Sequence, residues 1–273
     1  MTKTTRPPEP LGSCVDGDLL AFKAACFVDK YGEEFMEERL TQDLKLWDAG
    51  VGDQVIAFSC GRKDNYRRDF WPAYKAHRDG KAGPESLQAV RQWIVDNHPE
   101  TITAPRIEAD DLMGMFMSNG FTCVTKDKDL KSVPGWFWDP ETGFPMYHNE
   151  DEADLLFHKQ WLTGDTADNI AGIHRCGPKA ADRILEGVPF GKRSERVMNH
   201  YLEVQHDTVK WKVGTESYSG SRSDLLEQKY GWTKGHGEEY ALSQARCIRI
   251  LREGEWDQEA QKPLLWTPEQ GTA

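Results

Sequence analysis

The sequence predicts an α/β fold, in which a mainly parallel sheet is flanked by helices and followed by a helical C-terminal part. Over residues 12–150, short apolar runs alternate with segments of helical period, the pattern of a parallel sheet with crossover helices. After about residue 150 the strand signal fades and helical periodicity dominates. We therefore expect a loose tail (1–11), an α/β domain (12–150) and a helical domain (151–273).

The individual elements follow from the same periodicities. Short apolar runs bounded by polar or turn residues predict strands at 12–16, 55–58, 101–104, 121–125 and 136–138. Apolar residues at helical spacing predict helices at 17–30, 33–48, 84–96 and 108–118, and later at 151–163, 178–187, 192–204 and 237–253. The glycine- and serine-rich segment 214–224 is expected to be a flexible loop.

Composition narrows the class of protein. No apolar run approaches the length of roughly 18 residues that a membrane span needs, and the first residues lack a signal peptide's apolar stretch. The six cysteines are scattered without a CxxC pair, which favours a reducing, cytoplasmic setting and argues against a zinc finger. The net charge of −11 leaves a nucleic-acid partner possible only where positive charge is locally concentrated.

Eight carboxylates occur in four short clusters, and they carry the chemical prediction. The clusters are Asp16; Glu108, Asp110 and Asp111; Asp127 and Asp129; and Asp165 and Asp168. No basic residue is interleaved closely enough to neutralise them, and two like charges about 4 Å apart repel by roughly 4 kcal/mol at an effective dielectric near 20. If the clusters converge, divalent cations such as Mg²⁺ or Mn²⁺ must compensate them.

Two of these clusters also have simpler interpretations. Glu108 and Asp111 share one face of a predicted helix, where acids near the N-terminus commonly act as caps. Asp127 and Asp129 alternate with lysines, so in an extended segment both acids face one way, although a solvated loop has the same composition.

The fourth cluster leads into a glycine-flanked loop and a helix start with proline at its first position, Pro178. Backbone amides at such a start can grip a phosphate, and Lys179 and Arg183 add charge on one helix face. The run lacks the GK[ST] ending of a nucleotide-binding P-loop. A helical hairpin that holds a nucleic-acid backbone without reading sequence fits better, with an ordinary αα-hairpin as the alternative.

The segment from Arg62 to Lys81 is basic and aromatic. Its aromatic residues are Tyr66, Phe70, Trp71 and Tyr74. Such a mixture suits a single-stranded nucleic-acid channel, where bases stack on aromatic rings. The alternative is a set of core aromatics beneath a solvated face.

In motif order and content, residues 12–190 resemble the 5′ nuclease superfamily of flap endonucleases and 5′–3′ exonucleases. The motifs are Asp16, Glu108-x-Asp110-Asp111, Thr125-x-Asp127-x-Asp129 and Gly164-Asp165-x-x-Asp168-Asn169, and the run after them is similar to that family's helix–three-turn–helix, here at about 165–187. Chain length, the aromatic segment and the ending ARCIRIL are similar to exonucleases of small tailed phages.

The resemblance implies a PIN-like domain at 12–150, with a basic arch segment at 61–100, and two Mg²⁺ ions that Mn²⁺ can replace. One ion would be held, directly or through water, by Asp16, Glu108, Asp110, Asp111 and Asp127, and the other by Asp129, Asp165 and Asp168. Lys75 and Arg78, in a motif that begins at Tyr74, would steady the scissile phosphate, and the metal-holding Asp127 is counted with them as catalytic. The DNA contacts implied are Arg67, Arg68, Tyr74, Gly172, Gly177, Lys179 and Arg183, with a K⁺ ion at the helix–three-turn–helix.

The expected activity is hydrolysis near 5′ ends, gaps or flaps of duplex DNA, and of RNA paired to DNA, in replication or degradation within a host cytoplasm.

The chain departs from the family pattern at Cys60, which stands where an acid is usual, with Asp64 as a substitute four residues on. Because a thiol is a poor Mg²⁺ ligand, the alternative function is a non-catalytic DNA-junction binder. A PIN-type ribonuclease is a second alternative, which would not need the helical hairpin.

Overall fold

The computed structural model describes residues 7–98 and 100–269, and it divides into two compact units that are described separately below. Unit 1 is formed by segments within Met1–Asn65, Gly80–Ala153 and Ile250–Leu264, and unit 2 by segments within Tyr66–Asp79, Asp154–Arg249 and Leu265–Ala273. The chain passes between the two units several times. Only one of these passages, between Ala153 and Asp154, is near the predicted domain boundary at residue 150. The predicted tail lies partly outside the described residues.

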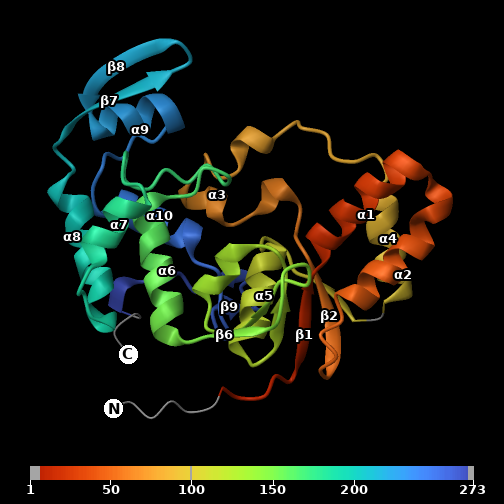
Figure 1. Cartoon of the computed structure of the whole chain (residues 1–273). Helices are drawn as coiled ribbons and strands as arrows, with labels where there is room; N and C mark the ends of the chain where they lie inside the picture. The colour runs from red at the N-terminus through yellow and green to blue at the C-terminus, as the bar shows by residue number, and fades with distance from the viewer. Residues whose placement is uncertain (1–6, 99, 270–273) are drawn as a thin grey trace. The chain divides into compact units, whose positions relative to one another are not determined.

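Unit 1 is built on a six-stranded sheet of order β3-β2-β1-β4-β5-β6 (Figure 1). The strands are β1 (Gly12–Asp16), β2 (Asp53–Phe58), β3 (Thr101–Thr103), β4 (Thr122–Val124), β5 (Gly135–Trp138) and β6 (Met146–His148). Neighbouring strands are parallel except for β6, which runs antiparallel to β5. The predicted mainly parallel sheet is thus confirmed, with β6 as an unpredicted edge strand.

Helices cover both faces of this sheet. One face of the sheet forms a core with the helices α1 (Gly17–Tyr31), α2 (Met36–Leu46) and α4 (Leu87–Asn97). On the other face, α5 (Ala109–Ser118) packs against β1 and β4 (Figure 1). The first core includes Leu20, Ile56 and Ile94, all at most 1% exposed. A short antiparallel pair, β9 (Trp256–Asp257) with β10 (Lys262–Pro263), completes the regular structure of unit 1.

Unit 2 is mainly helical and has an aromatic core. Its elements are α3 (Arg67–Phe70), α6 (Glu150–Thr163, whose first residues belong to unit 1), α7 (Pro178–Leu185), α8 (Arg193–Glu203), β7 (Thr208–Val213), β8 (Glu216–Ser221), α9 (Arg222–Tyr230) and α10 (Glu238–Ile248). Trp71, Trp161, Tyr201 and Tyr240 are completely buried. In the part of the chain that the structure describes, no helix combines the length and apolar character needed to cross a membrane.

The expectation of a flexible loop at 214–224 is wrong, because these residues form the turn and second strand of an antiparallel hairpin and the start of α9. The first strand alternates exposed and buried residues, and Trp211 stacks on Tyr218 across the ribbon with ring centroids 6.0 Å apart. Gly214 has φ 59° at the two-residue turn, the conformation that hairpin turns of this length favour. The first glycine of this segment lies in the hairpin turn, and serines of the second strand lie on its polar face.

His236 makes the stability of unit 2 depend on pH. It is 5% exposed, packs against Tyr201 and Tyr240, and neither of its ring nitrogens has a hydrogen-bond partner among the described residues. Burial, followed by the charge of Arg222, lowers the pKa of His236 to about 4. The unfolded chain therefore binds the extra proton between about pH 6.5 and 4, and stability is lost as the pH falls through this window. We expect the free energy of unfolding, measured in urea, to fall between pH 7 and pH 5 by about 2 kcal/mol less in His236→Phe than in wild type.

Equal losses in wild type and variant would show that His236 is not buried in the neutral form. His206→Phe is the control, because His206 is exposed and its substitution should leave the wild-type pH profile unchanged.

Candidate active site

Asp16 is the last residue of β1 and the N-cap of α1. Its Oδ1 accepts from the backbone N–H of Leu19 at 2.9 Å, and its Oδ2 accepts from the hydroxyl of Thr125 at 2.8 Å. The carboxyl is placed by the central strand, which is buried along its whole length. A parallel strand that runs directly into a helix thus fixes the acid at the carboxyl edge of the sheet, where ligand sites of α/β folds lie.

The electrostatic environment of Asp16 is unfavourable for a lone carboxylate. Burial, and further the charges of Asp18 and Asp127, raise the pKa of Asp16 to about 6, although its two hydrogen bonds act in the opposite direction. An acid held at 6% exposure beside other acids is stabilised in its charged form by a bound cation. This is the donor chemistry that a divalent ion requires.

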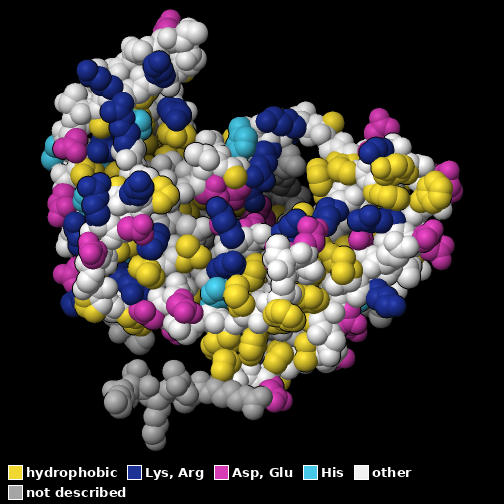
Figure 2. Space-filling model, viewed as in Figure 1, with side chains coloured by type: hydrophobic (Ala, Val, Ile, Leu, Met, Phe, Trp, Pro, Cys, Tyr) yellow, Lys and Arg dark blue, Asp and Glu magenta, His cyan; other side chains and the backbone are white. Residues whose placement is uncertain are grey.

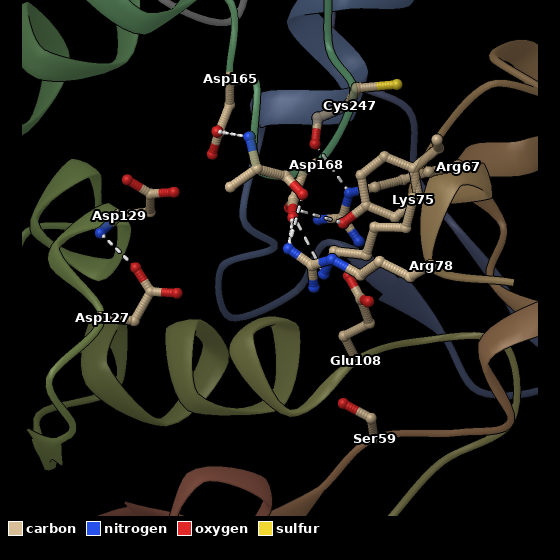
Figure 3. Close-up of polar contacts among 12 residues, drawn as sticks. Ser59, Arg67, Lys75, Arg78, Glu108, Asp127, Asp129, Asp165, Asp168 and Cys247 are labelled. Atoms are coloured by element: carbon tan, nitrogen blue, oxygen red, sulfur yellow. Dashed lines mark hydrogen bonds and ion pairs between the residues drawn. The ribbon is translucent and has the colours of Figure 1, made fainter. Parts of the chain in front are cut away.

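Asp127 and Asp129 follow β4 in the 3₁₀ turn that begins at Lys128. The Oδ1 of Asp127 accepts from the N–H of Asp129 at 2.9 Å (Figure 3). Both acids are half-buried, whereas the neighbouring Lys126 and Lys128 are exposed. The backbone N–H of Asp127 donates to the Thr125 hydroxyl that also contacts Asp16, so one threonine links the two acid segments.

Glu108 and Asp111 form a reciprocal cap at the start of α5, as the capping interpretation predicted. Asp111 is fully buried, and its oxygens accept from the backbone N–H groups of Glu108 and Leu251, each at 3.2 Å. These contacts hold Asp111 at the start of α5, and its role as a metal ligand stays a prediction. Glu108 and Asp110 are half-buried and remain candidates.

Cys60 lies close to the same acids. Burial, followed by the charges of Glu108, Asp64 and Asp111, raises the pKa of the Cys60 thiol to about 11. The thiol is therefore protonated at neutral pH, and its Sγ donates to the carbonyl of Gly61 at 3.4 Å. A protonated thiol at this position is a weak ligand, as expected from the sequence.

Three residues near this edge were not predicted as site residues. Asp18 accepts from the N–H of Ser59 at 3.0 Å and lies 3.6 Å from the guanidinium of Arg91 on α4. The Ser59 hydroxyl accepts from the N–H that opens α5, at Ala109. The sequence gives Arg91 no distinguishing context, since it sits on an otherwise ordinary amphipathic helix.

The oxygen-rich set in unit 1 fits Mg²⁺ or Mn²⁺ by donor chemistry. Within residues 7–98 and 100–269, however, no three His, Cys, Asp or Glu side chains stand close enough together to bind one ion directly. Ion binding therefore requires side-chain rotation or ligation through water, which is usual for Mg²⁺.

In unit 2, Asp165 and Asp168 lie in a loop that is closed by backbone contacts. Asp165 and Ile170 form an antiparallel bridge, and the Oδ1 of Asp165 accepts from the N–H of Ala167 at 2.7 Å. Gly164 and Gly172 meet where this loop closes, with φ 66° and 57°. A Cβ on Gly172 would lie 2.3 Å from the backbone nitrogen of Gly164, so the closure requires glycine.

Asp168 is neutralised by two cations, contrary to the expectation that the acid clusters lack basic partners. Its Oδ1 accepts from Arg78 at 2.9 Å, its Oδ2 lies 3.4 Å from Lys75 Nζ, and the Tyr74 hydroxyl donates to it at 3.3 Å (Figure 3). The prediction failed because the partners are about ninety positions away in sequence. Tyrosine, lysine and arginine of the predicted motif thus gather on one carboxylate, with Lys75 held at φ 51°.

The predicted DNA contacts Arg67 and Tyr74 are corrected by their burial. Each is 2% exposed. Arg67 donates to the backbone carbonyl of Cys247 (Figure 3) and to that of Arg249. Both therefore hold the segment 66–79 within unit 2. Tyr66 and Trp71 are buried as well, which decides for core aromatics over a stacking channel. Arg68 remains at the surface, paired with both oxygens of Asp79 at 2.9 Å.

The glycine-rich run after Asp168 has the predicted helix start. Gly177 precedes α7 as its N-cap, with proline at the first helical position. Lys179 and Arg183 are both exposed, and Arg183 Nε donates to the carbonyl of Lys179 at 3.3 Å. Gly172 is buried in the loop closure, so its backbone serves the loop shape.

Comparison with known proteins finds relatives that match nearly the whole chain. The chain is 26% identical over 282 residues to the exodeoxyribonuclease of Enterobacteria phage T3, covering 93% of this chain and 92% of that protein. It is likewise 26% identical to the exonuclease of Escherichia phage T7, with the same coverage. A DNA polymerase I of Rhizobium leguminosarum is 28% identical over 54% of this chain. No family model matches the sequence.

Solved structures share the fold. The phage T5 D15 protein crystallised with metal ions superposes with a TM-score of 0.58 over 87% of this chain and 89% of that one, at 16% identity. A T5 D15 flap endonuclease variant in complex with DNA and metal ions gives a TM-score of 0.53 at 15% identity, over 87% of this chain and 88% of that one. The resemblance to the 5′ nuclease superfamily, and to phage exonucleases in particular, is therefore confirmed.

The glycine closure provides a test of the loop geometry. Gly172→Ala places a methyl group against the Gly164 backbone at a positive φ, so we expect a loss of several kcal/mol, measured by urea unfolding. Gly177→Ala is the matched control, because a Cβ there meets nothing within 4 Å and its φ of −87° is ordinary. Similar stability of the two variants would contradict the closure.

Proposed function

We propose that this chain is a metal-dependent 5′–3′ nuclease that hydrolyses phosphodiester bonds near the 5′ ends of duplex DNA. The observation that carries the proposal is the buried Asp16, held beside Asp127 at the carboxyl edge of a parallel sheet. Near-full-length similarity to two phage exonucleases supports it.

Two ions are proposed, following the two groups of acids. The candidates in unit 1 are Asp16, Glu108, Asp110, Asp111, Asp127 and Asp129, and those in unit 2 are Asp165 and Asp168. When bound, such ions lower the pKa of an attacking water and stabilise the departing 3′ oxygen. Similar solved structures contain metal ions, and one T5 5′-exonuclease contains divalent metal ions, which supports metal dependence. Mg²⁺ with Mn²⁺ as substitute is proposed from the oxygen donors.

The cations of unit 2 supply the remaining charge. Lys75 and Arg78 converge on Asp168, a carboxylate that occupies them in the absence of substrate. A scissile phosphate carries the same kind of charge and can exchange with the carboxylate as their partner. Their role is to orient that phosphate and to offset the charge that develops on it.

DNA with a 5′ end, gap or flap is the proposed substrate, held by the exposed end of the loop at 172–177, where Gly177 caps α7, and by Lys179 and Arg183. A helix–three-turn–helix with a K⁺ ion, cleavage of RNA paired to DNA, and a role in replication within a host cytoplasm are finer proposals from the resemblance alone.

A non-catalytic DNA-junction binder is the second candidate, which the protonated thiol of Cys60 favours. Release of labelled nucleotides from a 5′-labelled duplex on addition of Mg²⁺ or Mn²⁺ distinguishes the two, because only an enzyme releases them.

Asp127→Asn tests the metal assignment. The amide retains the acceptor for the Asp129 N–H but removes the charge, so we expect hydrolysis in Mg²⁺ to fall about a hundredfold or more while duplex affinity in Ca²⁺ is kept. Asp48→Asn is the matched control, since exposed Asp48 makes the same kind of contact, to the N–H of Gly50. Wild-type turnover by the Asp127 variant would refute the assignment.

Lys75→Met and Arg78→Met test the role of the two cations. Because they act on developing charge, we expect each to lower kcat by about a hundredfold with little change in the dissociation constant of the duplex. Lys81→Met, an exposed lysine at the end of the same basic segment, should keep the wild-type kcat. A loss confined to binding affinity would show that Lys75 and Arg78 only hold DNA.

A further inference from the structure

On one face of the β7–β8 hairpin in unit 2, every side chain is a lysine, a serine or a threonine. Strand register places Lys210 opposite Ser219 and Lys212 opposite Ser217, and paired residues of an antiparallel ribbon share a face. With Thr208, these residues form what we call the outer face; all five are exposed. The alternating residues Val209 and Trp211 are buried.

The acid of the hairpin and its aromatic rings belong to the opposite face. Glu216 is opposite Val213 in the register and accepts from the Tyr218 hydroxyl. Trp211 stacks on Tyr218 and donates to Gln228 of α9 at 2.8 Å. The outer face therefore offers hydrogen-bond donors and positive charge, without an aromatic ring on which an unpaired base could stack.

The hairpin is attached to the loop that the proposed function assigns to the DNA backbone. His174 Nε2 contacts the carbonyl of Lys210 at 3.0 Å, and Arg222, the first residue of α9, donates to the carbonyl of His174 at 3.3 Å. Arg175 follows in that loop and Lys179 lies at the start of α7, and both are exposed. Figure 1 shows the ribbon of β7 and β8 next to α9, and Figure 2 shows Lys and Arg side chains gathered over this region.

The electrostatics of His174 confirm that positive charge is concentrated here. Burial first, and then the charges of Arg175, Arg222 and Lys229, lower the pKa of His174. Nearby acids are engaged locally: Asp224 caps α9, and Asp207 lies 3.4 Å from Arg222. A chain with net charge −11 thus carries a basic surface at the hairpin.

We infer that the outer face of the β7–β8 hairpin binds the sugar–phosphate backbone of duplex DNA, extending the contact made by the loop at 172–179. The inference rests on the proposed function, because it requires a DNA substrate. Lysine and hydroxyl groups contact phosphates without reading bases, so the hairpin adds affinity and footprint length but no sequence preference. The absence of stacking rings on this face of the described hairpin favours duplex over single strand.

The test is the variant K210T/K212T, which removes both charges and keeps residues that favour strands. Binding of a fluorescent blunt DNA duplex is measured by anisotropy in Ca²⁺, which replaces the catalytic ion, between about 50 and 300 mM KCl. Each phosphate contact contributes about 0.9 to the slope of log K against log salt. We expect the slope to fall by one to two and the affinity at low salt to fall about tenfold.

The control K45Q/K262Q removes two exposed lysines from unit 1 and should retain the wild-type slope. A slope reduction of one unit or more, specific to the hairpin variant, supports the inference. A smaller reduction, or an equal one in the control, overturns it. Unfolding in urea checks that the variant is folded, and unfolding near the wild-type midpoint is expected because both side chains are exposed. If wild type itself fails to bind duplex, the proposed function fails first.

Discussion

A carboxylate buried at the end of the central strand is the constraint on which the rest of unit 1 depends. Asp16 caps α1, accepts from Thr125 and lies near two other acids, at a cost that raises its pKa to about 6. The N-cap contributes to stability, but a neutral capping residue such as serine would supply it without burying a charge beside other acids. Sites that sacrifice stability in this way are commonly functional, which is why this residue carries the proposal.

In unit 2, basic side chains neutralise the acid Asp168. Asp168 is held by Lys75 and Arg78, and the same segment is anchored through the buried Arg67 to carbonyls of the chain near α10. The ion pairs keep two cations preorganised on one carboxylate, and the proposed function has a phosphate take its place. Both units therefore fix charged groups through backbone contacts, so that little rearrangement of the main chain is needed for binding.

The sequence predicted the parallel sheet because its strands are buried on both faces and read as apolar runs, as in Gly12–Asp16. It also placed Asp16 at the end of a strand, since the apolar run 12–16 coincides with β1. It could not predict the pairs that Asp168 makes with Lys75 and Arg78, because long-range partners leave no local pattern. Burial of Arg67 was invisible for the same reason, as its acceptors are carbonyls about 180 residues away.

The most direct test of the metal assignment is anomalous X-ray scattering from crystals grown with Mn²⁺. We expect one peak within ligand distance of Asp16 or Asp127 and a second beside Asp165 or Asp168. Manganese found only at other surface carboxylates, or no ordered ion at all, would contradict metal-dependent hydrolysis by these acids.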